Sequence, residues 1–291
     1  MGMFFLPTNE SVVMDLSDRS YRRQARALGI FVTIGAIFGL ILGVVVLLFN
    51  PMDNEALGLV GVVFFGPVIM WGVRGFKRAK ARRAYARIDA AQFPELHALV
   101  QKFSDRAGLR ELPPAYLVSD EAINPCAADM GARPSARIGS DFFAGCREND
   151  APEALEFMVA HQIAHLKAGH GSHWWSMVVA SVRLMPVLNA VVARYMEFHA
   201  DHLAAQMVPE GAAKAIGLCQ VGKDNFPYLN QQVQFSSAGK TRGLWGTLAK
   251  WSGLDVSPSE RYARLVDANL VPQPEDSTAT SFVSPRWNNG E

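Results

Sequence analysis

Apolar residues gather in two long uncharged runs near the amino terminus. The first covers the 23 residues from Ala27 to Phe49, and the second covers the 17 residues from Leu57 to Val73. An α-helix needs about 20 apolar residues to cross the hydrocarbon of a bilayer. A short acidic connection separates the runs, and basic residues precede the first and follow the second. The pattern predicts a two-helix transmembrane hairpin at residues 27–76, with both ends cytoplasmic by the positive-inside rule.

A soluble helix pair and a signal peptide both fit these runs less well. A pair of buried helices in a soluble core is disfavoured, because such helices rarely run this long without a charge. A cleavable signal peptide is disfavoured, because the first run begins late and a second run follows it. The hairpin divides the chain into a polar cytoplasmic segment (1–26), the hairpin, a domain at 77–271 and a tail at 272–291, whose Pro, Ser, Thr and Asn content predicts disorder.

The domain is expected to be mainly α (an α+β fold) with a small β-sheet. Residues 77–111 have a helical pattern, in which Pro94 opens a helix and Gly108 ends it. Asp150 is expected to cap the helix that carries the central motif. The apolar stretch from Trp174 to Met196 is too short for two crossings and is interpreted as a cytosolic helix pair. Strands are expected at 115–118 and 136–139, and further helices at 150–169, 197–207 and 257–269.

Composition narrows the class of function. A net charge of +1 and a charged fraction of 19% give no global field that would attract nucleic acid. The basic run from Arg74 to Arg87 is expected to face anionic lipid instead. Three widely spaced cysteines form no Cys-x-x-Cys pair and are expected to be reduced structural thiols. Six of the seven histidines lie between His161 and His202, which places the candidate chemistry there.

The central motif is a pair of histidines, His161 and His165, spaced so that one helix face presents both to a zinc ion. The usual zinc-protease motif is His-Glu-x-x-His, in which the Glu takes a proton from water. Gln162 occupies that position here and cannot take a proton. Glu197 on a later helix can supply a third ligand, and Asp201, one turn further on, can accept the free N–H of a ligand histidine.

Four motifs then occur in an order that resembles the HtpX-like membrane zinc metallopeptidases, relatives of the CAAX prenyl endopeptidases. They are Phe93-Pro94-Glu95-Leu96, Asn124 with the small and apolar residues after it, His161-x-x-x-His165 and Glu197-x-x-x-Asp201. The resemblance covers roughly residues 93–270, and the amino-terminal hairpin fits the same plan. It implies a helical gluzincin-type domain that binds Zn²⁺ through His161, His165 and Glu197, with Asp201 behind a ligand.

The resemblance also implies a substrate and a place for it. An extended peptide would pair with an edge strand in residues 124–138. The substrates would be unfolded or damaged membrane proteins, and the protein would be integral to the inner or plasma membrane with its site facing the cytoplasm. The residues assigned to substrate binding are Asn124, Cys126, Ala127 and Arg261.

The chain departs from the family pattern at three positions. Gln162 replaces the catalytic Glu. Pro125 removes one backbone N–H from the docking strand. Asp255 begins the segment in which the family has a histidine, ahead of Arg261, that helps to stabilise the tetrahedral intermediate.

Two interpretations of Gln162 remain open. It is either an engineered substitution that silences a metalloendopeptidase or the natural residue of a pseudopeptidase that binds peptides or a partner without cutting. The intact ligand set favours the first. An integral-membrane structural protein without metal is a third hypothesis, under which the spacing of Glu197 and Asp201 is coincidental. The nearby histidines are expected to serve polar packing rather than to be ligands or proton donors; they are His170, His173, His199 and His202.

Overall fold

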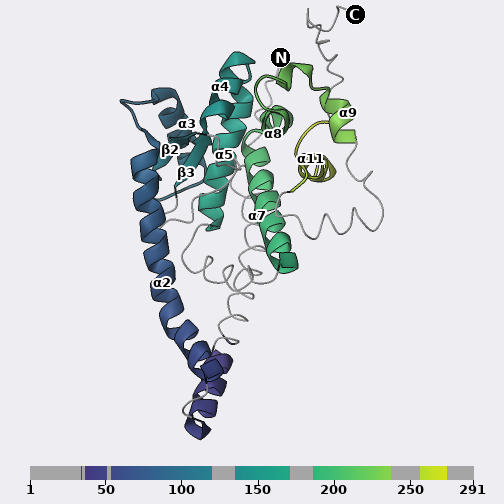
Figure 1. Ribbon diagram of the computed structural model, residues 1–291. Coiled ribbons are helices and arrows are strands. Elements are labelled where there is room, and N and C mark those ends of the chain that lie inside the picture. Colours follow the sequence, from purple (N-terminus) through teal and green to yellow (C-terminus); the bar gives the residue numbers. More distant parts are fainter. Residues whose placement is uncertain are drawn as a thin grey trace, which may run out of the picture.

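The computed structural model describes residues 34, 37–50, 54–119, 135–170, 186–236 and 256–273. The protein is mainly helical with a three-stranded sheet (Figure 1), which confirms the predicted mainly α class with a small β-sheet. Residues 37–49 are also helical. The labelled elements are α2 (Asn54–Ala84), β1 (Ala86–Ile88), α3 (Pro94–Arg106), β2 (Ala115–Val118), β3 (Ala136–Gly139), α4 (Ser140–Glu148), α5 (Pro152–Ala168), α7 (Pro186–Met207), η2 (Pro209–Gly211), α8 (Ala212–Val221), η3 (Phe226–Tyr228), α9 (Gln231–Ser236) and α11 (Pro258–Asp267).

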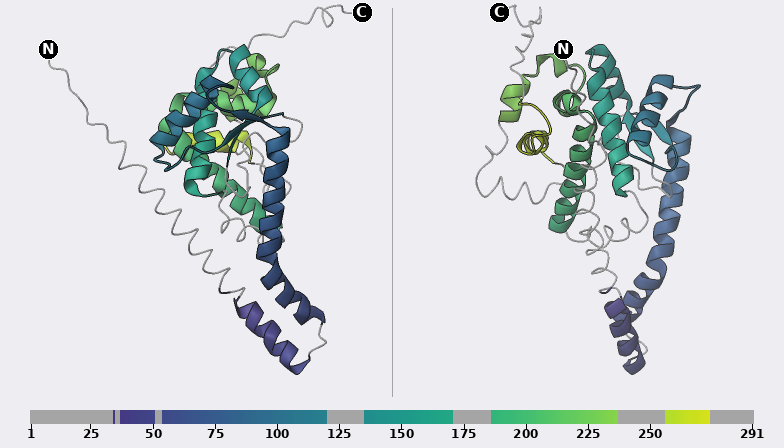
Figure 2. Two further views of the ribbon diagram at one scale, coloured as in Figure 1. Left: turned by 90° about the vertical axis from the view of Figure 1, so that its left-hand side faces the viewer. Right: turned by 180° about the vertical axis from the view of Figure 1, so that it is seen from behind.

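The long helix α2 projects from the domain, and the helical residues 37–49 lie beside its far end (Figure 2). Among the residues that the structure describes, no helix is both long enough and apolar enough to cross a bilayer. The transmembrane hairpin expected at 27–76 is therefore not supported by these helices. Part of the first apolar run, residues 27–33 and 35–36, lies outside the described residues.

The small sheet has the order β1-β2-β3, with β1 antiparallel to β2 and β2 parallel to β3. Ile88 is opposite Ala115, which is in turn opposite Ala136, so these three side chains share one face. All three are buried, and this face packs against α3 and α5. Hydrophobic burial on one side of the sheet therefore fixes its position against the central helix.

Helix α5 is the centre of the packing, since it contacts α3, α4, α7, α8 and β3. Every residue from Phe157 to His165 is buried, so the helix is enclosed on all sides. The turn η2 approaches α5 so closely that a Cβ on Gly211 would overlap the carbonyl oxygen of Glu153. His161, Gln162 and His165 are thus polar residues in the most enclosed helix of the domain.

Several local predictions are confirmed and others are wrong. Both expected strands are present, and α3 begins at Pro94 as predicted. Residues 77–111 are not helical throughout, because Ala86–Ile88 pairs with β2 as a strand. Asp150 is not the helix cap: it has a left-handed φ of 46°, and Ala151 is the cap residue, so α5 begins at Pro152. Helix α4 is present in the structure but was not predicted from the sequence.

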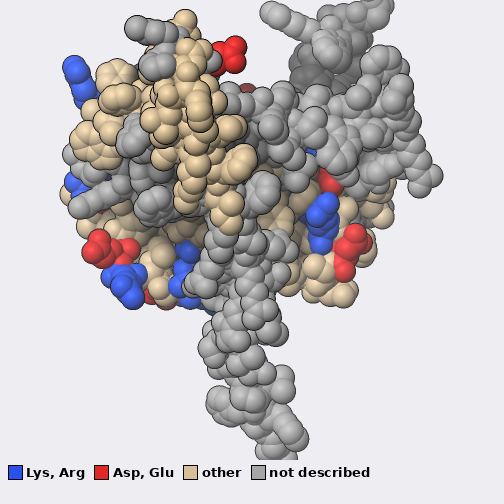
Figure 3. All heavy atoms as spheres, turned by 90° about the horizontal axis from the view of Figure 1, so that it is seen from below, with Lys and Arg blue, Asp and Glu red and all other residues tan. Residues whose placement is uncertain are grey.

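The described surface carries mixed charge. On the face shown in Figure 3, basic and acidic side chains of the described residues lie near one another in several places instead of separating by sign. Mixed charge of this kind produces little long-range field.

Candidate metal centre

Two packed helices supply three potential ligands. His161 and His165, one turn apart on α5, have ring centroids 4.6 Å from each other. Glu197 comes from α7, which packs directly against α5. Both histidines are almost fully buried, and the Glu197 side chain is 17% exposed. One ligand atom from each residue lies within 4.8 Å of the others, so the three residues form a group that can hold a metal ion.

The separations of the potential ligand atoms are of the size that a single bound metal ion requires. Nε2 of His161 and Nε2 of His165 are 3.0 Å apart; the first lies 3.5 Å from Oε2 of Glu197, and the second lies 3.5 Å from Oε1. Zinc bonds of about 2.0–2.1 Å at tetrahedral angles place neighbouring ligand atoms roughly 3.3–3.4 Å apart. Two imidazole nitrogens and one carboxylate oxygen are also the donor set of many catalytic zinc sites, which keep a fourth position open.

Asp201 fixes the orientation of His161. Its Oδ1 lies 2.9 Å from Nδ1 of His161, close enough for the ring N–H to donate to the carboxylate. An ionised carboxylate can only accept, so this neighbour favours a proton on Nδ1 of His161, which would leave the lone pair of Nε2 for a metal. Asp201 thus lies beside His161, one of the two histidines that the sequence predicts as ligands.

Arg261 holds Asp201 from the other side. Its Nε donates to Oδ2 of Asp201 at 2.7 Å and its Nη2 donates to Oδ1 at 2.6 Å, while Nη2 lies 3.8 Å from Glu197. Arg261 is only 8% exposed. The sequence assigned this residue to substrate binding, but its guanidinium is directed at the carboxylates that support the site. The two partners are 60 residues apart, so no local pattern signals the pair.

The charges of the site favour a cation. Burial opposes ionisation of Glu197, but His165, His161 and Arg261 outweigh it and lower the pKa of this carboxyl. Burial likewise opposes ionisation of Asp201, and Arg261 and His161 outweigh it, so its pKa is also lowered. Apart from the histidines, the two carboxylates and the one guanidinium contribute a net charge of −1 (−2 + 1) in a buried place. Such a charge is costly unless a positive group compensates it.

Two histidines that the sequence assigned to packing lie directly behind the ligands. Nδ1 of His170 is 2.8 Å from Nδ1 of His165, and Nε2 of His170 is 3.4 Å from Nδ1 of His199. Both are buried. Burial lowers the pKa of His165 to about 3 and the pKa of His170 well below its ordinary value, so both rings are neutral near pH 7 in the metal-free protein.

The remaining predicted residues are placed only in part. Gln162 is fully buried on α5, between the two histidines in sequence. Asn124, Pro125, Cys126 and Ala127 lie outside the described residues, as do His173 and Asp255.

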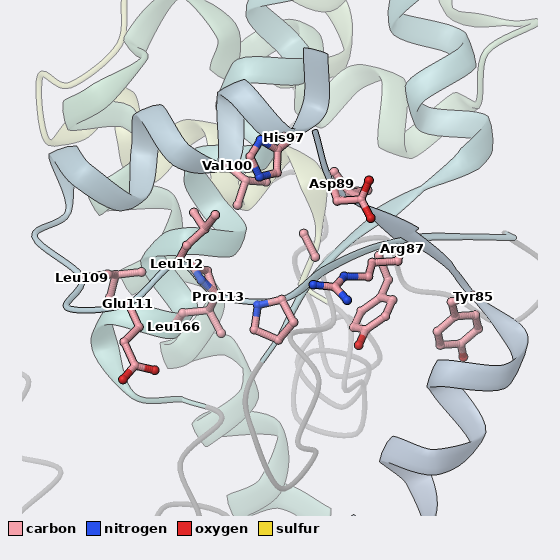
Figure 4. A pocket seen from close by; sticks show the side chains of 14 residues that line it. Tyr85, Arg87, Asp89, His97, Val100, Leu109, Glu111, Leu112, Pro113 and Leu166 are labelled. Carbon is pink, nitrogen blue, oxygen red and sulfur yellow. The ribbon is translucent and has the colours of Figure 1, made fainter. Parts of the chain in front are cut away.

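A large cavity lies apart from the metal group. Figure 4 shows it beside α3, β1 and the segment before β2, with a volume of about 960 Å³. Leu166 is its lining residue from α5, and none of the three potential ligands borders it. The cavity is therefore separate from the three potential ligands. Its polar lining residues include Arg87, Asp89, His97 and Glu111.

Substitution of Arg261 by Met should destabilise the fold strongly. Asp201, which is 1% exposed, would lose the partner that compensates its charge. Breaking a buried ion pair in this way costs about 3–5 kcal/mol. Denaturant unfolding of Arg261→Met beside Arg264→Met measures the effect, because Arg264 is exposed and should cost about 1 kcal/mol or less. Equal losses for the two variants would contradict the assigned role.

The metal-free protein should lose stability as the pH falls below about 6.5. The unfolded chain binds a proton at His165 below its ordinary pKa near 6.5, whereas the folded chain does not until about pH 3. Unfolding is then favoured by up to about 1.4 kcal/mol per pH unit for each such histidine. Asp201 adds a further loss of stability below about pH 4, because the stabilisation by its ionised carboxylate is lost as the pH falls toward its lowered pKa. Denaturant unfolding with a chelator at pH 7, 6, 5 and 4 tests this, and a flat profile from pH 7 to 5 would contradict it.

No protein-family model, no curated protein and no solved structure matches this chain. Any functional conclusion therefore depends on the site itself.

Proposed function

We propose that this chain has the architecture of a zinc metalloendopeptidase that acts on peptide bonds of unfolded or membrane proteins. In this chain, Gln162 replaces the general base. One observation carries the proposal: His161, His165 and Glu197 converge with separations of 3.0–3.5 Å. The likeness of the motifs to HtpX-like membrane metallopeptidases supports the same assignment.

Each residue of the site would have a distinct role in peptide hydrolysis. A zinc ion held by the two histidines and Glu197 would polarise a peptide carbonyl and lower the pKa of a water molecule. Asp201 and Arg261 would keep His161 in the tautomer that binds metal. A carboxylate at position 162 would take the proton of the attacking water on its side-chain oxygen, a role that the amide of Gln162 cannot perform.

A substrate would approach along the sheet. Strand β3 lies at one edge of the described sheet and contacts α5. An extended peptide can pair with such an edge through its backbone, which adds one strand to the sheet. This arrangement would bring the peptide beside the helix that carries both histidines.

The rival function is a zinc-containing module that binds peptides or a partner without cutting them. The observation in its favour is Gln162 itself, a neutral amide in a fully buried position of an otherwise complete site. Both functions require zinc, so zinc content does not distinguish them. Proteolytic activity after a carboxylate is restored at position 162 does.

Gln162→Glu should turn the chain into an active protease. A positioned general base contributes about 10²- to 10⁴-fold in rate. The measurement is cleavage of an unfolded protein substrate by Gln162→Glu and by the unaltered chain, each containing about one zinc ion per chain. Gln162→Glu with His161→Ala is the matched control and should be inactive. If Gln162→Glu holds zinc but cuts no faster than the unaltered chain, the binding module is the better account.

Membrane attachment is the second part of the proposal. Large apolar side chains are exposed along residues 37–49 and along α2: Phe38, Phe49, Phe65 and Phe76 are each 65% exposed or more. A protein surface of this extent normally contacts lipid or another protein. Basic residues follow the apolar part of α2 in the sequence, as expected for a segment that meets anionic headgroups.

Vesicle binding tests the attachment with a matched pair of valines. Val68 on α2 is 63% exposed, and Val233 on α9 is 66% exposed. Val68→Asp should release a substantial fraction of the chain from phospholipid vesicles, because an acidic residue in hydrocarbon costs about 2.5–3.5 kcal/mol. Val233→Asp should leave binding unchanged. If the unaltered chain does not bind the vesicles, membrane attachment is contradicted.

A further inference from the structure

The two ligand histidines are supported by chemically different partners. His161 faces the carboxylate of Asp201, whereas His165 faces another imidazole, that of His170, with Nδ1 to Nδ1 at 2.8 Å. The rings of His165 and His170 meet nearly edge to face, with centroids 4.9 Å apart and planes at 72°. Both residues are 1% exposed, so no bulk water competes for this contact.

The end of α5 is shaped to bring His170 back to His165. Gly169 ends the helix with a left-handed φ of 75°. The backbone N–H of Gly169 donates to Leu166 O, and that of His170 donates to His165 O, both at 3.1 Å. This is the paired bonding of a Schellman motif. Residues five apart would not face each other on a continuing helix, so the left-handed glycine is what places His170 behind the ligand.

Metal binding would determine which ring donates the hydrogen bond between His165 and His170. For Nε2 of His165 to offer its lone pair to a metal, the proton of the ring must sit on Nδ1. That N–H then donates to Nδ1 of His170, and the proton of His170 must sit on Nε2. Nε2 of His170 in turn faces Nδ1 of His199 at 3.4 Å. His199 lies on α7, two residues after Glu197, and its ring stacks on Tyr195 with planes at 11°.

We infer that His170, held by His199, is a positioning residue that fixes the orientation and tautomer of the ligand His165. The inference rests on the proposed zinc site and deepens it. His165 would then have hydrogen-bonding partners of its own, His170 and His199. These connect the end of α5 to α7, the helix that carries Glu197. Partners of this kind usually affect metal affinity by 10- to 100-fold.

Zinc affinity of the full chain, measured by competition with a chromogenic chelator, tests the inference. His170→Leu should bind zinc about 10- to 100-fold more weakly. His170→Asn, whose amide oxygen can accept from His165, should recover part of the loss. His202→Leu removes a half-buried imidazole from α7 that lies outside this chain of rings, and it should bind zinc as the unaltered protein does.

Imidazole nitrogen NMR of the zinc-loaded protein supplies a readout that a mere packing role would not change. The Nδ1–H of His165 should give a signal protected from exchange in the unaltered protein, and that signal should be lost in His170→Leu. If the unaltered protein holds no zinc, both the proposed function and this inference fail. If His170→Leu binds zinc as tightly as the unaltered protein, the inference alone is overturned.

A second pair of variants decides the matter if His170→Leu does not fold. Gly169→Val opposes the left-handed turn and displaces His170, whereas Asn adopts this conformation more readily. Apart from its chain neighbours and its own helix backbone, no atom of the described residues lies within 4 Å of a Cβ built on Gly169, so the two variants differ mainly in backbone preference. Gly169→Val should weaken zinc binding and Gly169→Asn should largely preserve it. Equal zinc affinity of these variants would overturn the inference.

Discussion

The buried contact between Asp201 and Arg261 is the interaction on which the rest of the site depends. Asp201 is 1% exposed, and its charge is tolerable only because Arg261 compensates it with two hydrogen bonds. The same carboxylate holds His161, so one residue couples α5, α7 and α11. Loss of the pair would leave a buried charge and an unsupported ligand at once. The stability of the domain and the geometry of the candidate metal site therefore both depend on this pair.

The position of the site within the core restricts its side chains. His161, Gln162 and His165 occupy a helix that is buried on all sides, where side chains have little room to change rotamer. The polar groups that lie nearest to the two histidines belong to Asp201, His170 and Glu197. Ligands held by packing and by further hydrogen bonds are the usual requirement for a precise metal site. This arrangement places several polar groups together in the core, which lowers stability. A bound cation would compensate their negative charge.

Sequence reasoning reaches the elements with clear local signals. The spacing of His161 and His165, and of Glu197 and Asp201, places each pair on one helix face, and the apolar pattern locates β2 and β3. Helix α4 escapes prediction because Gly145 interrupts its helical propensity, and Asp150 has the side chain of a cap but adopts a left-handed φ. The contacts of Arg261 and His170 have no local signal: the first depends on packing between distant helices, and the second on the turn at Gly169.

The central claim is that two imidazoles and one carboxylate bind zinc together. X-ray absorption at the zinc edge, on the unaltered chain and on Glu197→Gln, tests it most directly. We predict two imidazole nitrogens and carboxylate or water oxygen at about 2.0–2.1 Å, with four-coordinate geometry, and an altered oxygen shell or loss of zinc in Glu197→Gln. Zinc bound through sulfur at about 2.3 Å, or an environment unchanged in Glu197→Gln, would contradict it.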